Sequence, residues 1–207
     1  MATARDTTRV IRSTISVNTW LRRTPTVDEV RPPVCVVCGA AARPAVGKLG
    51  LHGHGTRGRQ LRGPPTPGAP PAMVVVPTRR YQCQHCPAVL VVVPSETAPR
   101  RHYAATAIAC ALALYGLCAQ SHAEVRAQIS PAKVVGVGAE RRWCTLPRWI
   151  DAVVDRALFA AVPAVPRDLP RRDVAGRAAM AIGAHAPPTM QQGAPQVRAF
   201  FGAVQMP

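Results

Sequence analysis

The chain has 207 residues and a formal net charge of +16, with 26 basic against 10 acidic residues. Nearly all of the positive charge is arginine, which favours polyanionic partners, although a GC-rich coding bias would also enrich arginine together with alanine, proline and glycine. The apolar run 104–117 is too short to span a bilayer, and the first 31 residues lack the apolar core of a signal peptide. We therefore expect a soluble, cytoplasmic protein with no membrane contact.

The N-terminal segment, residues 1–31, places several arginines around a weak apolar pattern. Val10, Ile11, Trp20 and Leu21 are part of this pattern. It predicts a short strand or helix, with frayed ends, that packs on the next part of the chain.

Two C-x-x-C pairs come next, Cys35 with Cys38 and Cys83 with Cys86. Each pair holds two thiolates close together, so the four cysteines predict a tetrahedral metal site of the zinc-ribbon type. The alternatives are a redox pair or unpaired cysteines, and iron could take the place of zinc. The gap between the pairs exceeds the common 15 to 20 residues, so we expect an insertion to loop out between them.

The ribbon is expected over residues 32–94 as a small antiparallel sheet. Residues 49–55 are glycine-rich and predict a turn or an irregular strand, and the proline-rich segment 63–71 predicts a loop. Three runs of strand length, at 74–76, 79–82 and 89–93, are predicted as the strands that carry the two C-x-x-C turns, here called knuckles.

Residues 100–160 are predicted to be helical. Apolar residues recur at three- and four-residue steps from Tyr103, and Ser121 with Glu124 forms a capping box that opens a second helix over 122–129. We expect Thr145 to cap a third helix, with Leu146, Trp149, Ile150, Val153, Val154 and Ala157 as its buried stripe. The three helices suggest a helix-turn-helix. Its connection, 130–144, is longer than usual, so either an extra helix is inserted there or the recognition helix is misassigned.

The C-terminal segment, residues 161–207, starts as a proline linker and continues with helices expected near 171–184 and 196–204. Cys110 and Cys118 lie in the first apolar helix, where cysteine behaves as a small hydrophobe. Asp151 and Asp155 predict a solvated helix face that pairs with Arg148 or Arg156. No carboxylate cluster could hold two catalytic metal ions, so we expect no enzyme activity.

The histidines are expected to be structural or surface residues. His85 lies inside the second knuckle, but four cysteines already saturate a zinc ion. His52 and His54 alternate along a probable strand. A structural, backbone-contact or solubilising role is expected for them, and a second metal site is the least favoured alternative.

Several motifs together resemble the zinc-ribbon plus helix-turn-helix proteins related to the N-terminal regions of bacterial transposases. They are Arg31-Pro-Pro-Val-Cys-x-x-Cys38-Gly39, His52-Gly-His-Gly55, Arg79-Arg-Tyr-x-Cys-x-x-Cys86, Val92-Val-Pro94, Tyr103 and Thr145-Leu-x-Arg-Trp149. The resemblance covers about residues 20–201. It implies recognition of element DNA, and a separately encoded transposase subunit as a further partner.

The fold class expected is therefore α+β, a four-cysteine zinc ribbon followed by an all-helical helix-turn-helix region that binds DNA. Residues flanking the second knuckle and the first helix would meet phosphates, and residues at the third helix would meet base edges. In chain order these residues are Arg79, Arg80, Arg100, Arg101, Arg141, Arg142, Thr145 and Arg148. The alternatives are a protein-interaction module and the remnant of an enzyme that has lost its catalytic half.

Overall fold

The computed structural model describes residues 8–132 and 143–206, which form two compact units. The sheet unit comprises Met1–Arg59 and Val75–Thr97, and the helical unit comprises Gln60–Val74 and Ala98–Pro207. The chain therefore passes from one unit to the other within two strands and once more after Thr97. The division differs from the expected ranges, because 60–74 falls with the helices rather than with the ribbon.

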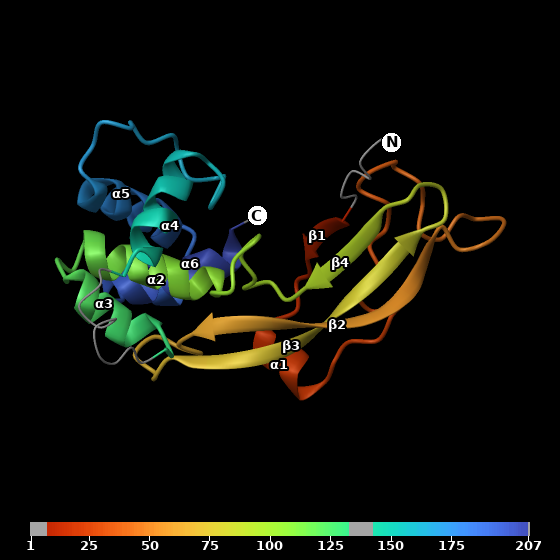
Figure 1. Cartoon of the computed structure of the whole chain (residues 1–207), viewed down its shortest axis with the longest axis horizontal. Helices are drawn as coiled ribbons and strands as arrows, with labels where there is room; N and C mark the ends of the chain where they lie inside the picture. Colours follow the sequence, from red (N-terminus) through yellow and green to blue (C-terminus); the bar gives the residue numbers. More distant parts are fainter. Residues whose placement is uncertain (1–7, 133–142, 207) are drawn as a thin grey trace. The chain divides into compact units, whose positions relative to one another are not determined.

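One four-stranded sheet has the order β1-β4-β3-β2 (Figure 1). β1 runs parallel to β4, and β3 runs antiparallel to β4, so the sheet is mixed and not purely antiparallel as predicted. The difference arises because the N-terminal segment adds a strand beside β4. The strands are β1 Thr8–Arg12, β2 Leu51–Gly63, β3 Ala72–Cys83 and β4 Val89–Val93.

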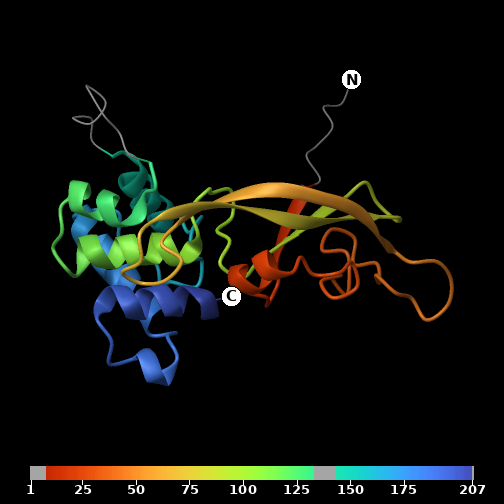
Figure 2. The same ribbon diagram turned by 90° about the horizontal axis from the view of Figure 1, so that it is seen from below.

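The core of the sheet unit lies under helix α1, Val17–Arg22, and the segment after it. In Figure 2, α1 and this segment lie on one side of β2 and β3. Trp20 and Tyr81 are fully buried, and the Trp20 Nε1 group donates to the carbonyl oxygen of Pro77 at 2.7 Å. In β3, residues 79–82 pair with β4, and Pro77 lies before this paired stretch. The Trp20 indole therefore binds a carbonyl oxygen of β3 that does not pair with β4.

Arginine and tyrosine side chains hold the segment after α1 against the sheet. The Tyr81 hydroxyl donates to the carbonyl oxygen of Val27 at 2.5 Å, and Arg79 Nε donates to that of Pro25 at 2.7 Å. The Arg31 guanidinium lies 5.6 Å from the centroid of the Tyr81 ring and pairs with Asp28. Two arginines of this unit therefore serve its own fold.

The helical unit is built around α2, which is buried along most of its length and packs against α3, α4, α5 and α6. Small side chains let these helices approach closely. The helices are α2 Ala105–Gly116, α3 His122–Ile129, α4 Thr145–Val154, α5 Arg171–Gly183 and α6 Pro195–Gln205, with a 3₁₀ turn at Pro188–Met190.

Two glycine positions show how close the helices lie. A Cβ atom on Gly116 would fall 2.2 Å from the amide nitrogen of Gly176 in α5. A Cβ atom on Gly202 in α6 would fall 2.0 Å from the carbonyl oxygen of Ile182. Since neither distance tolerates a side chain, glycine is required at both crossings.

The tip of the β2–β3 hairpin completes the helical unit. The Arg62 amide donates to the carbonyl of His102 at 2.7 Å, and the Ala104 amide donates to the carbonyl of Arg62 at 3.0 Å. A Cβ atom on Gly63, whose φ is +129°, would lie 2.3 Å from the Cβ of Ala107. The backbone of the hairpin therefore lies directly against the start of α2.

Most of the predicted helices are confirmed, with two corrections. α3 spans the predicted residues and both halves of the capping box of Ser121 and Glu124 are present. Thr145 does not cap α4: the N-cap is Cys144, whose side chain makes no capping hydrogen bond, and Thr145 is the first helical residue. Asp151 and Asp155 are exposed as expected.

The second correction concerns the partners of these two aspartates, which were predicted wrongly. Asp151 pairs with Arg171 at 3.3 Å and Asp155 pairs with Arg167 at 2.7 Å, because the segment after α4 returns alongside it. Residues 133–142 of the 130–144 connection, where an inserted helix is one expectation, lie outside the described residues. Within the described part of the chain, no helix is long and apolar enough to cross a membrane.

Candidate metal centre

Four cysteines from distant parts of the chain meet at one end of the sheet unit. Cys35 and Cys38 lie in the loop between α1 and β2, Cys83 is the last residue of β3, and Cys86 lies in the turn before β4. Their sulfur atoms all lie within 4.8 Å of one another. The predicted cluster is therefore confirmed as a group of four thiols that could hold a metal ion.

The distances between the sulfur atoms distinguish a metal site from disulfides. The closest pairs join the two motifs: Cys35 Sγ lies 3.8 Å from Cys86 Sγ, and Cys38 Sγ lies 3.7 Å from Cys83 Sγ. A disulfide requires about 2.05 Å. A tetrahedron with metal–sulfur bonds of about 2.3 Å has edges of about 3.8 Å, so the arrangement fits a tetrahedral ion such as zinc.

The first C-x-x-C turn needs a glycine after its second cysteine. Gly39 has φ +75°, a left-handed conformation that other residues adopt only with strain. This conformation lets the Gly39 amide donate to the carbonyl of Cys35 at 2.8 Å, while the Cys35 amide donates to that of Ala40 at 2.8 Å. One tight turn therefore brings the side chains of both Cys35 and Cys38 to the four-thiol cluster.

Gly50 joins the two turns. Its amide donates to the carbonyl of Ala42 at 2.9 Å, and its carbonyl accepts from the amide of Gln84 at 2.9 Å. A Cβ atom on Gly50 would lie 2.1 Å from the carbonyl oxygen of Ala41, so only glycine fits. In the second turn, the Cys83 amide donates to the carbonyl of Ala88 at 3.0 Å.

The surroundings of the cluster shift the pKa values of two of its thiols. Burial raises the pKa of Cys35, but the amides of Cys38 and Val37 and the neighbouring thiols lower it to about 7. The Ala88 amide lowers the pKa of Cys86, whereas burial and hydrogen bonds with the other three thiols raise it to about 12. Metal ligation requires thiolates, so a bound divalent cation would displace protons from the cluster.

The predicted DNA-binding residues are divided between the units. Arg79 and Arg80 are half-buried on β3 in the sheet unit, and Arg79 is held by the Pro25 carbonyl. The helical unit contains exposed Arg100 and Arg148 and half-buried Arg101 and Thr145. Arg141 and Arg142 lie outside the described residues.

The surface of α4 is less basic than predicted. Beside Arg148, its exposed side carries Asp151 and Asp155, both paired with arginines from the following segment. Leu146 and Trp149 are buried, and Trp149 packs edge-on against Tyr103 with ring centroids 4.9 Å apart. Within the described residues α3 and α4 contact each other at most marginally, so the helix-turn-helix stays a prediction.

Other arginines of the sheet unit were not predicted as binding residues. Arg57 is exposed on β2, and Arg12 and Arg59 are half-buried on β1 and β2. Burial lowers the pKa of both Arg12 and Arg59. Arg57 and Arg59 are two residues apart, and this spacing could have indicated that both lie on one face of a strand. The glycine-rich sequence concealed the length of β2.

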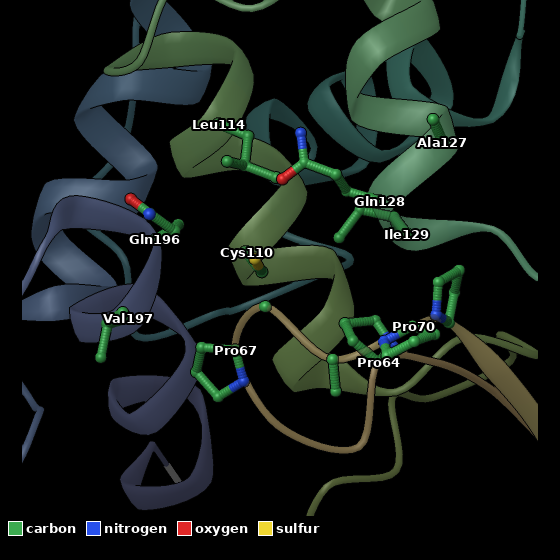
Figure 3. Close-up of a pocket in the computed structure, with 13 residues that line it drawn as sticks. Pro64, Pro67, Pro70, Cys110, Leu114, Ala127, Gln128, Ile129, Gln196 and Val197 are labelled. Atoms are coloured by element: carbon green, nitrogen blue, oxygen red, sulfur yellow. The ribbon is translucent and has the colours of Figure 1, made fainter.

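A hollow in the helical unit is a weaker candidate site. The loop prolines Pro64, Pro67 and Pro70 face Cys110 of α2 across a volume of about 460 Å³ (Figure 3). Burial raises the pKa of Cys110 to about 12, with a further increase from Cys118. Among the described residues that line the hollow, Cys110 is the one titratable group, and it stays protonated near neutral pH. The lining therefore offers no nucleophile or base.

Comparisons with known proteins give no relative. No protein-family model matches the chain, and neither the curated proteins nor the solved structures contain a significant match. The function of this chain is therefore inferred from its own residues.

Proposed function

We propose that the chain is a zinc-stabilised DNA-binding protein related to the recognition regions of bacterial transposases, without a catalytic core of its own. In this proposal the four-cysteine region is a zinc ribbon, and α3 and α4 form a helix-turn-helix. The observation that carries the proposal is the excess of positive charge that is left after the internal ion pairs are accounted for.

The described carboxylates are largely engaged within the protein. Asp28 pairs with two arginines, Glu29 pairs with Arg23, and Glu96 accepts from the amide of Val17. Asp151 and Asp155 pair with arginines of the helical unit. Among the described residues, arginines such as Arg57, Arg80, Arg148 and Arg177 have no carboxylate partner, and guanidinium groups can bind phosphate groups bidentately.

Zinc has a structural role in this proposal. The sheet unit has a small core that includes Trp20, Tyr81, Leu51 and Leu90, and much of the loop around the first knuckle is exposed. Binding of zinc by four thiolates supplies folding free energy that this small core lacks. The ion would link residues 35–38 to the end of β3 and so fix the loop on the sheet.

Metal analysis and DNA binding on the same purified sample test the proposal. We expect one zinc per chain, binding to duplex DNA, and a log–log dependence of affinity on salt with a slope of about −0.9 per phosphate contact. We expect no strand cleavage with magnesium or manganese. Absence of DNA binding at low salt by the zinc-loaded protein would contradict the proposal.

A second candidate is a protein-interaction module, and one observation favours it. Val34, Val36 and Val37 beside the first knuckle are 42%, 55% and 44% exposed, and Val46 is 90% exposed. Exposed valines gathered on one loop are typical of a protein contact, such as one with a separate transposase subunit. Replacing Val36 and Val37 by Ser should leave DNA affinity unchanged and abolish such an association.

A further inference from the structure

The two faces of the sheet unit differ in what they carry. Side chains of Arg79 and Tyr81 contact the segment after α1, so they mark the covered face of the sheet. Because side chains alternate along a strand, Arg80 points to the opposite face. Arg80 pairs with Val91 of β4, and Val91 pairs with Val10 of β1, so these three residues form one row across the sheet.

β1 adds a second arginine to the same face. Arg12 pairs with Val93, which lies two residues beyond Val91 on β4. Residues two apart share a face, so Arg12 lies on the side of Arg80. Arg12 is half-buried, and burial lowers its pKa, although a guanidinium stays protonated at neutral pH.

β2 adds two more. A Cβ atom on Gly58 would lie 3.1 Å from a side-chain carbon of Val75, which is on the covered face by alternation from Arg79. Arg57 and Arg59, on either side of Gly58, therefore point to the opposite face. The carbonyl of Arg57 accepts from the Thr78 hydroxyl at 2.8 Å, which places Arg57 beside Thr78 on β3.

The positions of two other glycines imply a bulge in β2 that accounts for this phasing. A Cβ atom on Gly53 would lie 2.9 Å from Val27, so Gly53 also points to the covered face, although it is an odd number of residues from Gly58. Gly55 lies between them with φ +76°, the conformation of a bulge residue. The bulge shifts the alternation by one residue and brings both β2 arginines to the face of Arg80.

The resulting arginine face, Arg12, Arg57, Arg59 and Arg80, takes one residue or two from each of three strands. Acidic groups of this unit are engaged elsewhere in the described structure: Asp28 and Glu29 with arginines of the loop after α1, and Glu96 with the Val17 amide. The like charges of Arg12, Arg57 and Arg80 on this face repel each other, and a polyanion would reduce this repulsion.

The aromatic residues of the unit indicate which polyanion. Trp20 and Tyr81, its only residues among Phe, Trp and Tyr, are both fully buried. Surfaces that bind single-stranded nucleic acid stack bases chiefly on exposed Phe, Tyr and Trp rings, and the described part of this unit exposes none of these. A duplex requires no such rings, because its phosphates alone can be contacted.

We propose that the arginine face binds the phosphate backbone of duplex DNA and so positions the protein on it. The inference rests on the proposed DNA-binding function and adds to it a location for the phosphate contacts, on the sheet. Contacts of this kind carry no sequence information.

Salt-dependent binding of the full-length, zinc-loaded chain tests the location. Arg57→Ala and Arg80→Ala should each weaken binding to every duplex alike and reduce the salt slope by about 0.9. The ratio of affinities at 50 and 200 mM salt should then fall about 3.5-fold for each phosphate interaction removed. Arg22→Ala, an exposed arginine on α1 at the covered face, is the matched control and should change neither quantity.

Zinc content and circular dichroism check that each variant is folded, and Arg57→Lys should restore most of the salt slope. Equal losses from Arg22→Ala and Arg57→Ala would overturn the inference, and so would tighter binding to a single strand than to the duplex. Loss of binding only in Arg148→Ala would refute the location but leave the proposed function standing. If the unaltered protein binds no DNA, the proposed function itself fails.

Discussion

The sheet unit and the helical unit are stabilised by different means. In the sheet unit, a loop lies on the strands through polar contacts such as Arg79 with Pro25 and Tyr81 with Val27, and four thiols gather at its end. In the helical unit, a buried helix packs closely through alanine and glycine. We therefore expect the stability of the sheet unit to depend on a bound metal ion, and the stability of the helical unit to depend on the absence of side-chain atoms at the helix crossings.

The largest effect is expected from removing a metal ligand. Cys83→Ser should abolish metal binding and unfold the sheet unit, because structural zinc contributes about 10–16 kcal/mol in small domains. The helical signal in circular dichroism should largely remain. Metal analysis and limited proteolysis measure both results, and Cys144→Ser, an exposed cysteine in the helical unit, is the control. Unchanged protease resistance in metal-free protein would show that the sheet unit does not need the ion.

The reverse experiment introduces a side chain at a helix crossing. Gly202→Val should destabilise the helical unit by about 1–3 kcal/mol or more, because its Cβ would lie 2.0 Å from the carbonyl of Ile182. Thermal unfolding of the helical signal measures the loss, while zinc content should not change. Gln205→Val places the same residue at an exposed position of α6 and should have a much smaller effect. A stable Gly202→Val protein would mean that the crossing can relax.

The smallest effect concerns the end of one helix. Ser121→Ala removes the hydroxyl that accepts from the Glu124 amide and should cost about 1 kcal/mol. Ser121→Asp keeps an acceptor at the N-cap and should restore most of the loss. Denaturant unfolding compares the three proteins, and equal stability of the Ser121→Ala and parent proteins would show that α3 is held by packing alone.

Sequence reasoning succeeded where local chemistry determines the structure. The capping box placed α3, and the two C-x-x-C motifs identified the four clustered thiols, because both patterns act over a few residues. Residues 49–55 were expected as a turn or an irregular strand, and the full extent of β2 was missed because its glycines have low strand propensity, which pairing with β3 overrides. The runs 74–76 and 79–82 were expected separately but belong to one strand, β3.

The roles of individual arginines could not be predicted for a related reason. Arg79 and Arg80 are adjacent and chemically identical, yet the first binds the loop after α1 and the second points away from it. Strand alternation separates them, and a glycine bulge at Gly55 decides the phase on β2. Neither the face that is covered nor the bulge can be read from composition.

The hairpin tip within the helical unit has a consequence for how the protein is made. Leu61 and Pro64 are buried in a unit whose helices begin at Ala105, so this core combines two separate stretches of the chain. During synthesis the tip leaves the ribosome first and stays apolar and uncovered until α2 emerges. A fragment beginning at Ala98 would keep every helix of the unit but lack this cover, so it should be more prone to aggregation than the intact chain.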